Sequence, residues 1–202
     1  MTDGELKQLY EKLYFQEIDA RDKIQGRLQL SLTLLLALGG AVAFLMQNFD
    51  YQTGQWTAIR GAFVFFVCTG AVALVVATVY FVKAFWNNTY YFLPDSAKTA
   101  KYRRVLDETY AQYEDRERLV AKAMDDYVFG YYVEYAAFNT RANDRRSAYV
   151  HLCNGGTISA AFFFALAFLA FYFGELDKGR IRQATEISII KPVDVRVTHQ
   201  GK

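Results

Sequence analysis

The chain has 202 residues, a mass of 23.1 kDa and a formal net charge of +2, and its mean hydropathy is only +0.01. The charged residues are strongly segregated, because three stretches contain no Asp, Glu, Lys or Arg: residues 28–49, 61–82 and 147–174. Apolar runs of this length exclude a disordered chain, a disulfide scaffold and a water-soluble globule. The composition indicates an all-α integral membrane protein.

The amino-terminal segment, residues 1–27, is predicted to form a cytoplasmic amphipathic helix. Its apolar residues recur near helical spacing, with charged residues on the opposite side. Gly26 is the only break before the first apolar run, so we expect a helix that continues into the membrane with at most a slight bend. The segment carries six acidic residues, which argues against a cleaved signal peptide.

Residues 28–86 contain two apolar runs and are predicted to form a transmembrane helical hairpin. About 20 apolar helical residues span the hydrocarbon core, and backbone groups inside lipid need partners within a helix. Small residues recur at spacings that let helices approach closely. The candidate packing residues are Gly39, Ala43, Gly70, Ala73 and Ala77. They favour self-association, and packing within one chain explains them equally well.

Residues 87–147 are predicted to form a cytoplasmic helical segment. The Pro-Asp-Ser sequence at 94–96 is a helix start signal. Apolar and aromatic residues then step by three or four over residues 102–138, with one gap at the charged patch 114–118. This pattern is typical of a helix packed on one face.

The cytoplasmic segment is either one long helix or two helices folded at Gly130 or around residues 139–144. Its acidic and basic charges nearly cancel, whereas a nucleic-acid surface shows a basic excess, so nucleic acid is not an expected partner. Lipid head groups are expected partners where the segment meets the membrane. The candidate head-group contacts are Arg145, Arg146 and His151.

Residues 148–174 are predicted to form the third transmembrane helix, whose first half is more polar than the second. Its candidate pore-lining residues are Asn154, Thr157 and Ser159, of which the first two share a helix face. Hydrogen bonds between helices, or from a hydroxyl to its own helix, explain the same residues.

The basic residues predict the orientation of the three crossings. There are five before the first run, one in residues 47–60 and eleven in residues 83–146, which places the amino terminus in the cytoplasm. The tail, residues 175–202, is then outside, although its six basic residues pull the other way. Its alternating Ile and Val residues on either side of Pro192 predict an extended, strand-like arm.

No chemistry-bearing motif is found. The two cysteines and two histidines have no metal-ligand spacing, and no phosphate-binding, nucleophile-elbow or zinc-protease motif is present. Asp125, Asp126 and Glu134 scatter around a helix without a histidine partner. We therefore expect neither enzymatic activity nor a cofactor or metal.

The layout resembles small membrane effectors of bacterial anti-phage defence, including the SLATT type. The matching parts are a charged amino-terminal helix (YEKLYFQEIDARDKIQGRLQ), two close membrane helices and a long cytoplasmic helical segment, over roughly the first 130 residues. The third crossing and the tail depart from the two-helix pattern. A looser likeness, to three-crossing bacterial membrane proteins, is carried by the run Asn139-Thr-Arg-Ala-Asn143-Asp-Arg-Arg146.

The resemblance implies a homo-oligomeric effector that permeabilises the bacterial inner membrane after a separate sensor detects infection. The alternative is a non-enzymatic anchor or scaffold that recruits a soluble partner through its cytoplasmic helices. A regulated channel of ordinary physiology is a third hypothesis.

Overall fold

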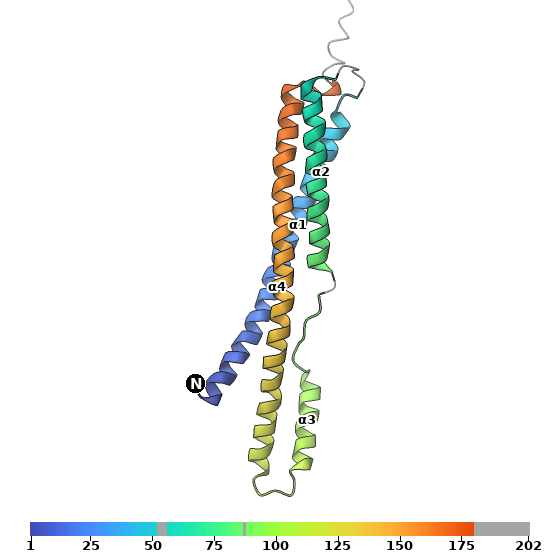
Figure 1. Ribbon diagram of the computed structural model, residues 1–202. Helices are drawn as coiled ribbons and strands as arrows, with labels where there is room; N and C mark the ends of the chain where they lie inside the picture. The colour runs from blue at the N-terminus through green and yellow to red at the C-terminus, as the bar shows by residue number, and fades with distance from the viewer. Residues whose placement is uncertain (52–55, 87, 180–202) are drawn as a thin grey trace, which may run out of the picture.

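The computed structural model describes residues 1–51, 56–86 and 88–179. Its four helices are α1 (Asp3–Asn48), α2 (Ala58–Phe85), α3 (Ser96–Thr109) and α4 (Arg116–Phe173). Helices α1, α2 and α4 lie together at one end of an elongated molecule, and α3 lies beside α4 at the other end (Figure 1). The all-helical class is confirmed for the described residues. The predicted arm around Pro192 lies outside them.

Helix α1 runs for 46 residues from the water-facing segment through the first apolar run. Its start is fixed by a capping box, in which the Thr2 side chain accepts from the Glu5 N–H and the Glu5 carboxylate accepts from the Thr2 N–H. Gly26 causes no break because the residues on both sides keep packing partners: Ile24 and Leu28 are both buried. The expectation of a continuous helix is confirmed.

Helix α4 is the longest element, with 58 residues. The chain folds at residues 110–115, so both positions predicted for the fold, Gly130 and residues 139–144, are wrong and lie inside α4. The gap in the apolar repeat at residues 114–118 marks the true turn, because no apolar face is available there to hold a helix against its neighbour. A single glycine costs a packed helix only about 1 kcal/mol.

Three helices are long and apolar enough to cross a membrane: α1, α2 and α4. Within their most apolar stretches only 22 %, 22 % and 28 % of residues are buried in the protein. Most of this apolar surface therefore faces outward, which indicates a membrane protein because water does not tolerate a surface of this kind. The segment predicted as the third transmembrane helix, residues 148–174, is not a separate helix but the second half of α4.

The helical segments outside the uncharged runs form a unit that we call the stalk: residues 3–27 of α1, all of α3 and residues 116–146 of α4 (Figure 1). Aromatic rings hold it together. Tyr102 of α3 stacks on Tyr127 of α4 at 4.2 Å, and Tyr10 of α1 meets Phe129 at 5.6 Å. A hydrogen bond to Tyr131 and partial desolvation raise the pKa of Tyr127 to about 12. The predicted packed face of this segment is therefore filled by α3 on one side and α1 on the other.

In the apolar half, α2 and α4 approach closely at two glycines. A Cβ atom on Gly70 would lie 2.6 Å from the Phe164 ring, and one on Gly156 would lie 3.0 Å from Ala77. Small residues thus serve packing within one chain here. By contrast, a Cβ atom on Gly39 would meet no atom within 4 Å.

The remaining predicted packing residues divide in the same way. Ala77 is fully buried, Ala73 is half-buried, and Ala43 is exposed. The surface that α1 leaves open around Gly39 and Ala43 is available for another molecule, whereas the small residues of α2 are largely used within the chain.

Candidate functional site: a polar network at the base of the stalk

Three polar residues of α4 share one helix face at the level where the stalk meets the apolar half. Asn139, Asn143 and Arg146 stand four and three positions apart, and their exposed fractions are 0 %, 5 % and 4 %. Their hydrogen-bond partners lie on α1, at the end of α2 and in the linker that follows it, residues 88–95. Buried polar groups are costly unless they are hydrogen-bonded, so their partners explain why they are tolerated.

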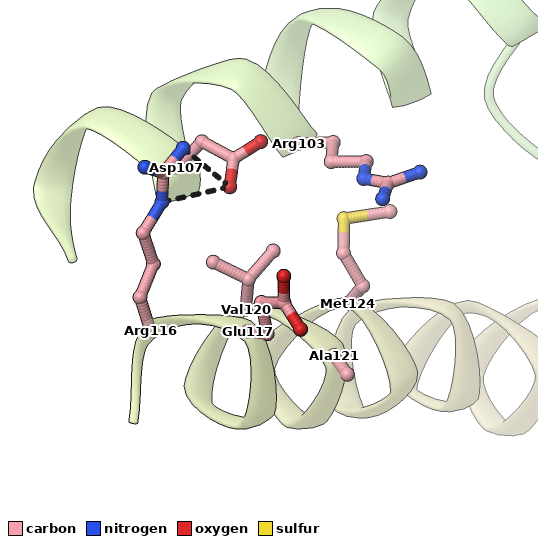
Figure 2. Close-up of a pocket in the computed structure, with 7 residues that line it drawn as sticks. All are labelled: Arg103, Asp107, Arg116, Glu117, Val120, Ala121 and Met124. Atoms are coloured by element: carbon pink, nitrogen blue, oxygen red, sulfur yellow. Dashed lines mark hydrogen bonds and ion pairs between the residues drawn. The ribbon is translucent and has the colours of Figure 1, made fainter. Parts of the chain in front are cut away.

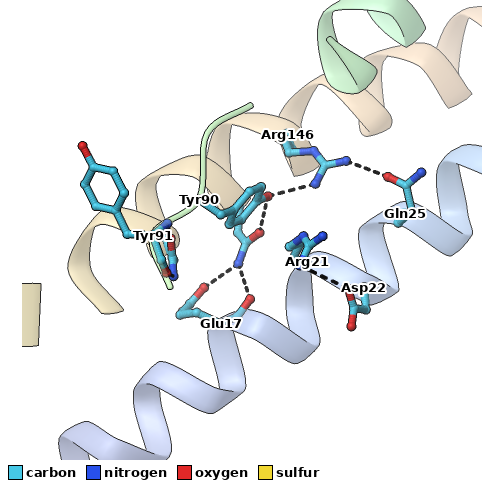
Figure 3. Close-up of polar contacts among 9 residues, drawn as sticks. Glu17, Arg21, Asp22, Gln25, Tyr90, Tyr91 and Arg146 are labelled. Carbon is cyan, nitrogen blue, oxygen red and sulfur yellow. Dashed lines mark hydrogen bonds and ion pairs between the residues drawn. The ribbon is translucent and has the colours of Figure 1, made fainter. Parts of the chain in front are cut away.

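The guanidinium of Arg146 joins three segments of the chain. Its Nε donates to the Ala84 carbonyl at 3.0 Å, and its two terminal nitrogens donate to the Tyr90 hydroxyl at 2.9 Å and to Gln25 Oε1 at 3.1 Å (Figure 3). The Ala84 carbonyl belongs to the last turn of α2, where the helix dipole favours a cation. Arg146 is therefore a buried cation held by neutral oxygens and by the carboxyl end of α2.

Asn143 extends the network toward α1. Its Nδ2 donates to both the backbone carbonyl and the carboxylate of Glu17, each at 2.8 Å, and its Oδ1 accepts from the Tyr90 hydroxyl at 2.8 Å. Tyr90 thus accepts from Arg146 and donates to Asn143, which fixes the direction of both bonds. One phenol connects the linker to two positions of α4.

Asn139 binds the linker backbone. Its Oδ1 accepts from the Tyr91 N–H and its Nδ2 donates to the Tyr91 carbonyl, both at 3.0 Å. The Leu93 N–H donates to the Tyr14 hydroxyl of α1 at 3.1 Å. Since this linker has no helix of its own to satisfy its backbone, these side chains take the place of secondary structure.

Arg21 of α1 closes the network on its outer side. Its guanidinium lies 5.4 Å from the Tyr90 ring centre and 5.3 Å from that of Phe92, and 3.9 Å separates it from the Asp22 carboxylate (Figure 3). Stacked rings and a nearby carboxylate occupy this cation as well.

The head-group prediction for Arg146 needs correction, because its side chain is buried and donates to three groups of the protein. Arg145 and His151 are exposed, so the prediction rests on these two. Their neighbour on the helix faces inward because successive residues on an α-helix point about 100° apart.

The three predicted pore-lining residues do not share one surface. Thr157 is buried and donates to the Cys153 carbonyl at 2.8 Å, whereas Ser159 is exposed and donates to the Gly155 carbonyl at 2.9 Å. Asn154 is exposed, with its Oδ1 2.9 Å from the Ser31 hydroxyl of α1. One copy of the chain therefore does not assemble these residues into a lining.

A hollow of polar character, which we call the tip hollow, lies at the tip of the stalk, between α3 and the start of α4 (Figure 2). It has a volume of about 740 Å³ and is lined by Arg103, Asp107, Arg116, Glu117, Val120, Ala121 and Met124. Arg116 and Asp107 form an ion pair at 3.2 Å across the hollow. The charged rim of both signs suits a protein surface better than a small apolar ligand.

Within residues 1–51, 56–86 and 88–179, no group of three His, Cys, Asp or Glu side chains could hold a metal ion. Asp125 and Asp126 both approach Lys7 of α1, which raises the pKa of that lysine chiefly through its hydrogen bond to Asp125. These acids therefore tie α1 to α4. The polar network of Asn139, Asn143 and Arg146 holds α1, α4 and the linker in register.

Comparison with protein-family models, curated proteins and solved structures gives no match, so the function is argued from the geometry of this chain alone. Sequence reasoning noted the run from Asn139 to Arg146 but missed its partners Glu17, Gln25 and Tyr90. The available signal was two asparagines and an arginine on one helix face, between an aromatic face and an apolar run.

Proposed function

We propose that the protein is a non-enzymatic effector of the bacterial inner membrane, in which several copies associate and permeabilise the bilayer. The amino terminus and the stalk lie in the cytoplasm, and the tail lies outside. The anti-phage role is the one that the SLATT-like layout implies, with a soluble sensor acting on the stalk.

The observation that carries the proposal is the amide of Asn154. It is exposed on α4 eight residues beyond Arg146, which is about 12 Å deeper along the helix axis. Ser31 is its one hydrogen-bond partner within the described residues. An amide carries two N–H groups, so at least one of them has no acceptor in the chain.

A polar N–H directed at lipid is costly, and such groups in membrane helices face protein or water. A second copy supplies an acceptor if its α4 or α1 packs here, and a water-filled path supplies one if several copies surround it. The open surface around Gly39 and Ala43 on α1 supports the same association, because small residues let helices come close.

A proteoliposome assay tests this proposal. Purified protein in vesicles that contain a trapped dye should release it, and Asn154→Leu should reduce release while insertion and helicity are kept. Thr78→Val is the matched control: this exposed hydroxyl of α2 already donates to the Leu74 carbonyl at 2.8 Å, so its loss leaves no unpaired group. Release that Asn154→Leu leaves unchanged would refute the role of Asn154.

The orientation has its own test. A reporter that is active only in the cytoplasm should give no signal when fused after Lys202 and a full signal when fused before Met1. A strong signal from the carboxyl-terminal fusion would contradict three crossings in this direction.

The second candidate function is a membrane anchor that recruits a soluble partner. The tip hollow favours it, because it lies at the end of the stalk farthest from the apolar half and has a charged rim (Figures 1 and 2). If the parent protein releases no dye even when its genetic neighbours are present, the anchor function replaces the effector function.

A further inference from the structure

The strongest unassigned feature lies where the apolar runs of α2 and α4 end side by side. A hollow of about 380 Å³ is lined there by Val82, Lys83, Trp86, Asn88, Arg145 and Tyr149. Lys83 directly follows the uncharged run of α2, and Arg145 comes two residues before that of α4. Both cations therefore stand at one membrane boundary and face one hollow.

Within the described part of the chain, the two cations have no carboxylate partner. Among the ion pairs of the described residues, neither Lys83 nor Arg145 takes part. The Lys83 ammonium lies 5.5 Å from the Tyr80 ring centre, which leaves its N–H groups available. Two exposed positive groups on one hollow attract an anion with at least one acceptor oxygen for each.

A neighbouring hollow is a poorer site for an anion, because its two cations already have partners. That hollow, of about 470 Å³, also contains two arginines, Arg21 and Arg146. Arg146 is already bonded to three oxygens and Arg21 is stacked on two rings beside Asp22. An anion there would have to replace existing contacts, whereas Lys83 and Arg145 form no ion pair within the described residues that an anion would have to displace.

The remaining lining residues favour a lipid head-group phosphate over a free phosphate as the anion. Trp86 and Tyr149 are aromatic residues of the kind that sit at the level of lipid head groups, and Val82 belongs to the apolar run below them. A head-group phosphate would meet Lys83 and Arg145 while its acyl chains lie along α2. A free phosphate would leave the aromatic and apolar part of the hollow unfilled.

We infer that the hollow between α2 and α4 is a binding site for the head group of an anionic phospholipid, with Lys83 and Arg145 as its phosphate contacts. The lipid bridges the last turn of α2 to the stalk–membrane boundary of α4. Lipid binding at this site does not require that the protein releases dye. The test of lipid binding and the test of the effector function can therefore fail independently.

The test uses the full-length protein in an uncharged detergent and native mass spectrometry with equal amounts of dioleoyl phosphatidylglycerol and dioleoyl phosphatidylcholine. The parent should retain phosphatidylglycerol preferentially. A lysine or arginine near an anionic surface contributes about a fivefold gain in affinity, so the variant K83Q/R145Q should bind phosphatidylglycerol about thirtyfold more weakly.

The matched control is K101Q/K122Q, which removes the same charge from two exposed stalk lysines outside the hollow. It should retain the parent's preference. Equal loss in both variants, or equal retention of the two lipids by the parent, would overturn the inference. Displacement of the lipid by an equimolar concentration of inorganic phosphate would overturn the lipid source and leave a simple anion site.

A second readout guards against a folding defect. In a Trp56→Phe background, Trp86 is the single tryptophan of the chain, and its fluorescence should shift when phosphatidylglycerol is added. K83Q/R145Q should keep the parent's helicity and lose the shift. A shift of the parent's size in that variant would contradict the assigned contacts.

Discussion

Replacing Asn139 by leucine tests whether the polar network holds the linker in place. The side chain is fully buried, and its two hydrogen bonds to Tyr91, both at 3.0 Å, use the amide as a substitute for backbone pairing. Each bond contributes about 1 kcal/mol net, and an unpaired backbone group adds about 1–3 kcal/mol where water is excluded. Tyr91 is 40 % exposed, so water relieves part of that penalty. We expect a loss of about 2–4 kcal/mol.

The free energy of unfolding in detergent measures this loss, and limited proteolysis locates it. Cleavage should appear first in residues 88–95, before the helices are cut. Thr140→Val is the control, because its hydroxyl donates only to the Ala136 carbonyl of its own helix at 2.9 Å. Asn139→Asp keeps the acceptor for Tyr91 but buries a charge, and it should destabilise at least as much as leucine. A loss below about 0.5 kcal/mol for Asn139→Leu, or cleavage that starts elsewhere, would refute the reasoning.

Two further predictions concern packing and titration. Gly70→Leu should destabilise the single chain by about 1–3 kcal/mol, because a Cβ atom already falls 2.6 Å from Phe164, whereas Gly39→Leu should leave the chain stable and weaken its oligomers. Melting curves with native mass spectrometry separate the two effects, and equal melting losses would contradict them. The pKa of Tyr127 is raised from 10.0 to about 12, so the fold favours the neutral phenol. Its contribution to stability is complete below pH 10 and is lost as the pH rises from there through about 12. Tyr131→Phe should return the pKa of Tyr127 toward 10.0, as ultraviolet absorbance of the tyrosinate would show, and an unchanged titration would exclude the hydrogen bond as the main cause.

The helices were predictable because their signals are local and long. Each uncharged run exceeds the length that a membrane crossing needs, and the continuity of α1 follows from an apolar repeat that does not stop at Gly26. The prediction misplaces the turn at residues 110–115 because it treats Gly130 as a helix breaker and does not treat the charged gap at 114–118 as one. Packing decided the outcome: Phe129, next to Gly130, packs against Tyr10 of α1 and holds this part of the helix in place.

The network at the base of the stalk was harder to predict. Asn139, Asn143 and Arg146 are visible as a pattern, but their partners lie 48 to 126 positions away in the chain. From their charge alone, Arg145 and Arg146 are both predicted to contact lipid head groups. Successive residues of a helix point in different directions, so Arg146 faces inward and donates to the Ala84 carbonyl at the end of α2, whereas Arg145 is exposed.

The length of the stalk also separates two electrostatic environments. Residues 116–146 of α4 extend about 45 Å from the tip hollow to Arg146. The screening length at physiological ionic strength is about 8 Å, so the charges of anionic lipids have almost no effect at the tip. A partner that binds Arg103 or Glu117 is therefore chosen by the tip alone and does not compete with the bilayer. Added salt that weakens the binding of such a partner at the tip would do so independently of its effect on the proposed lipid contacts at Lys83 and Arg145.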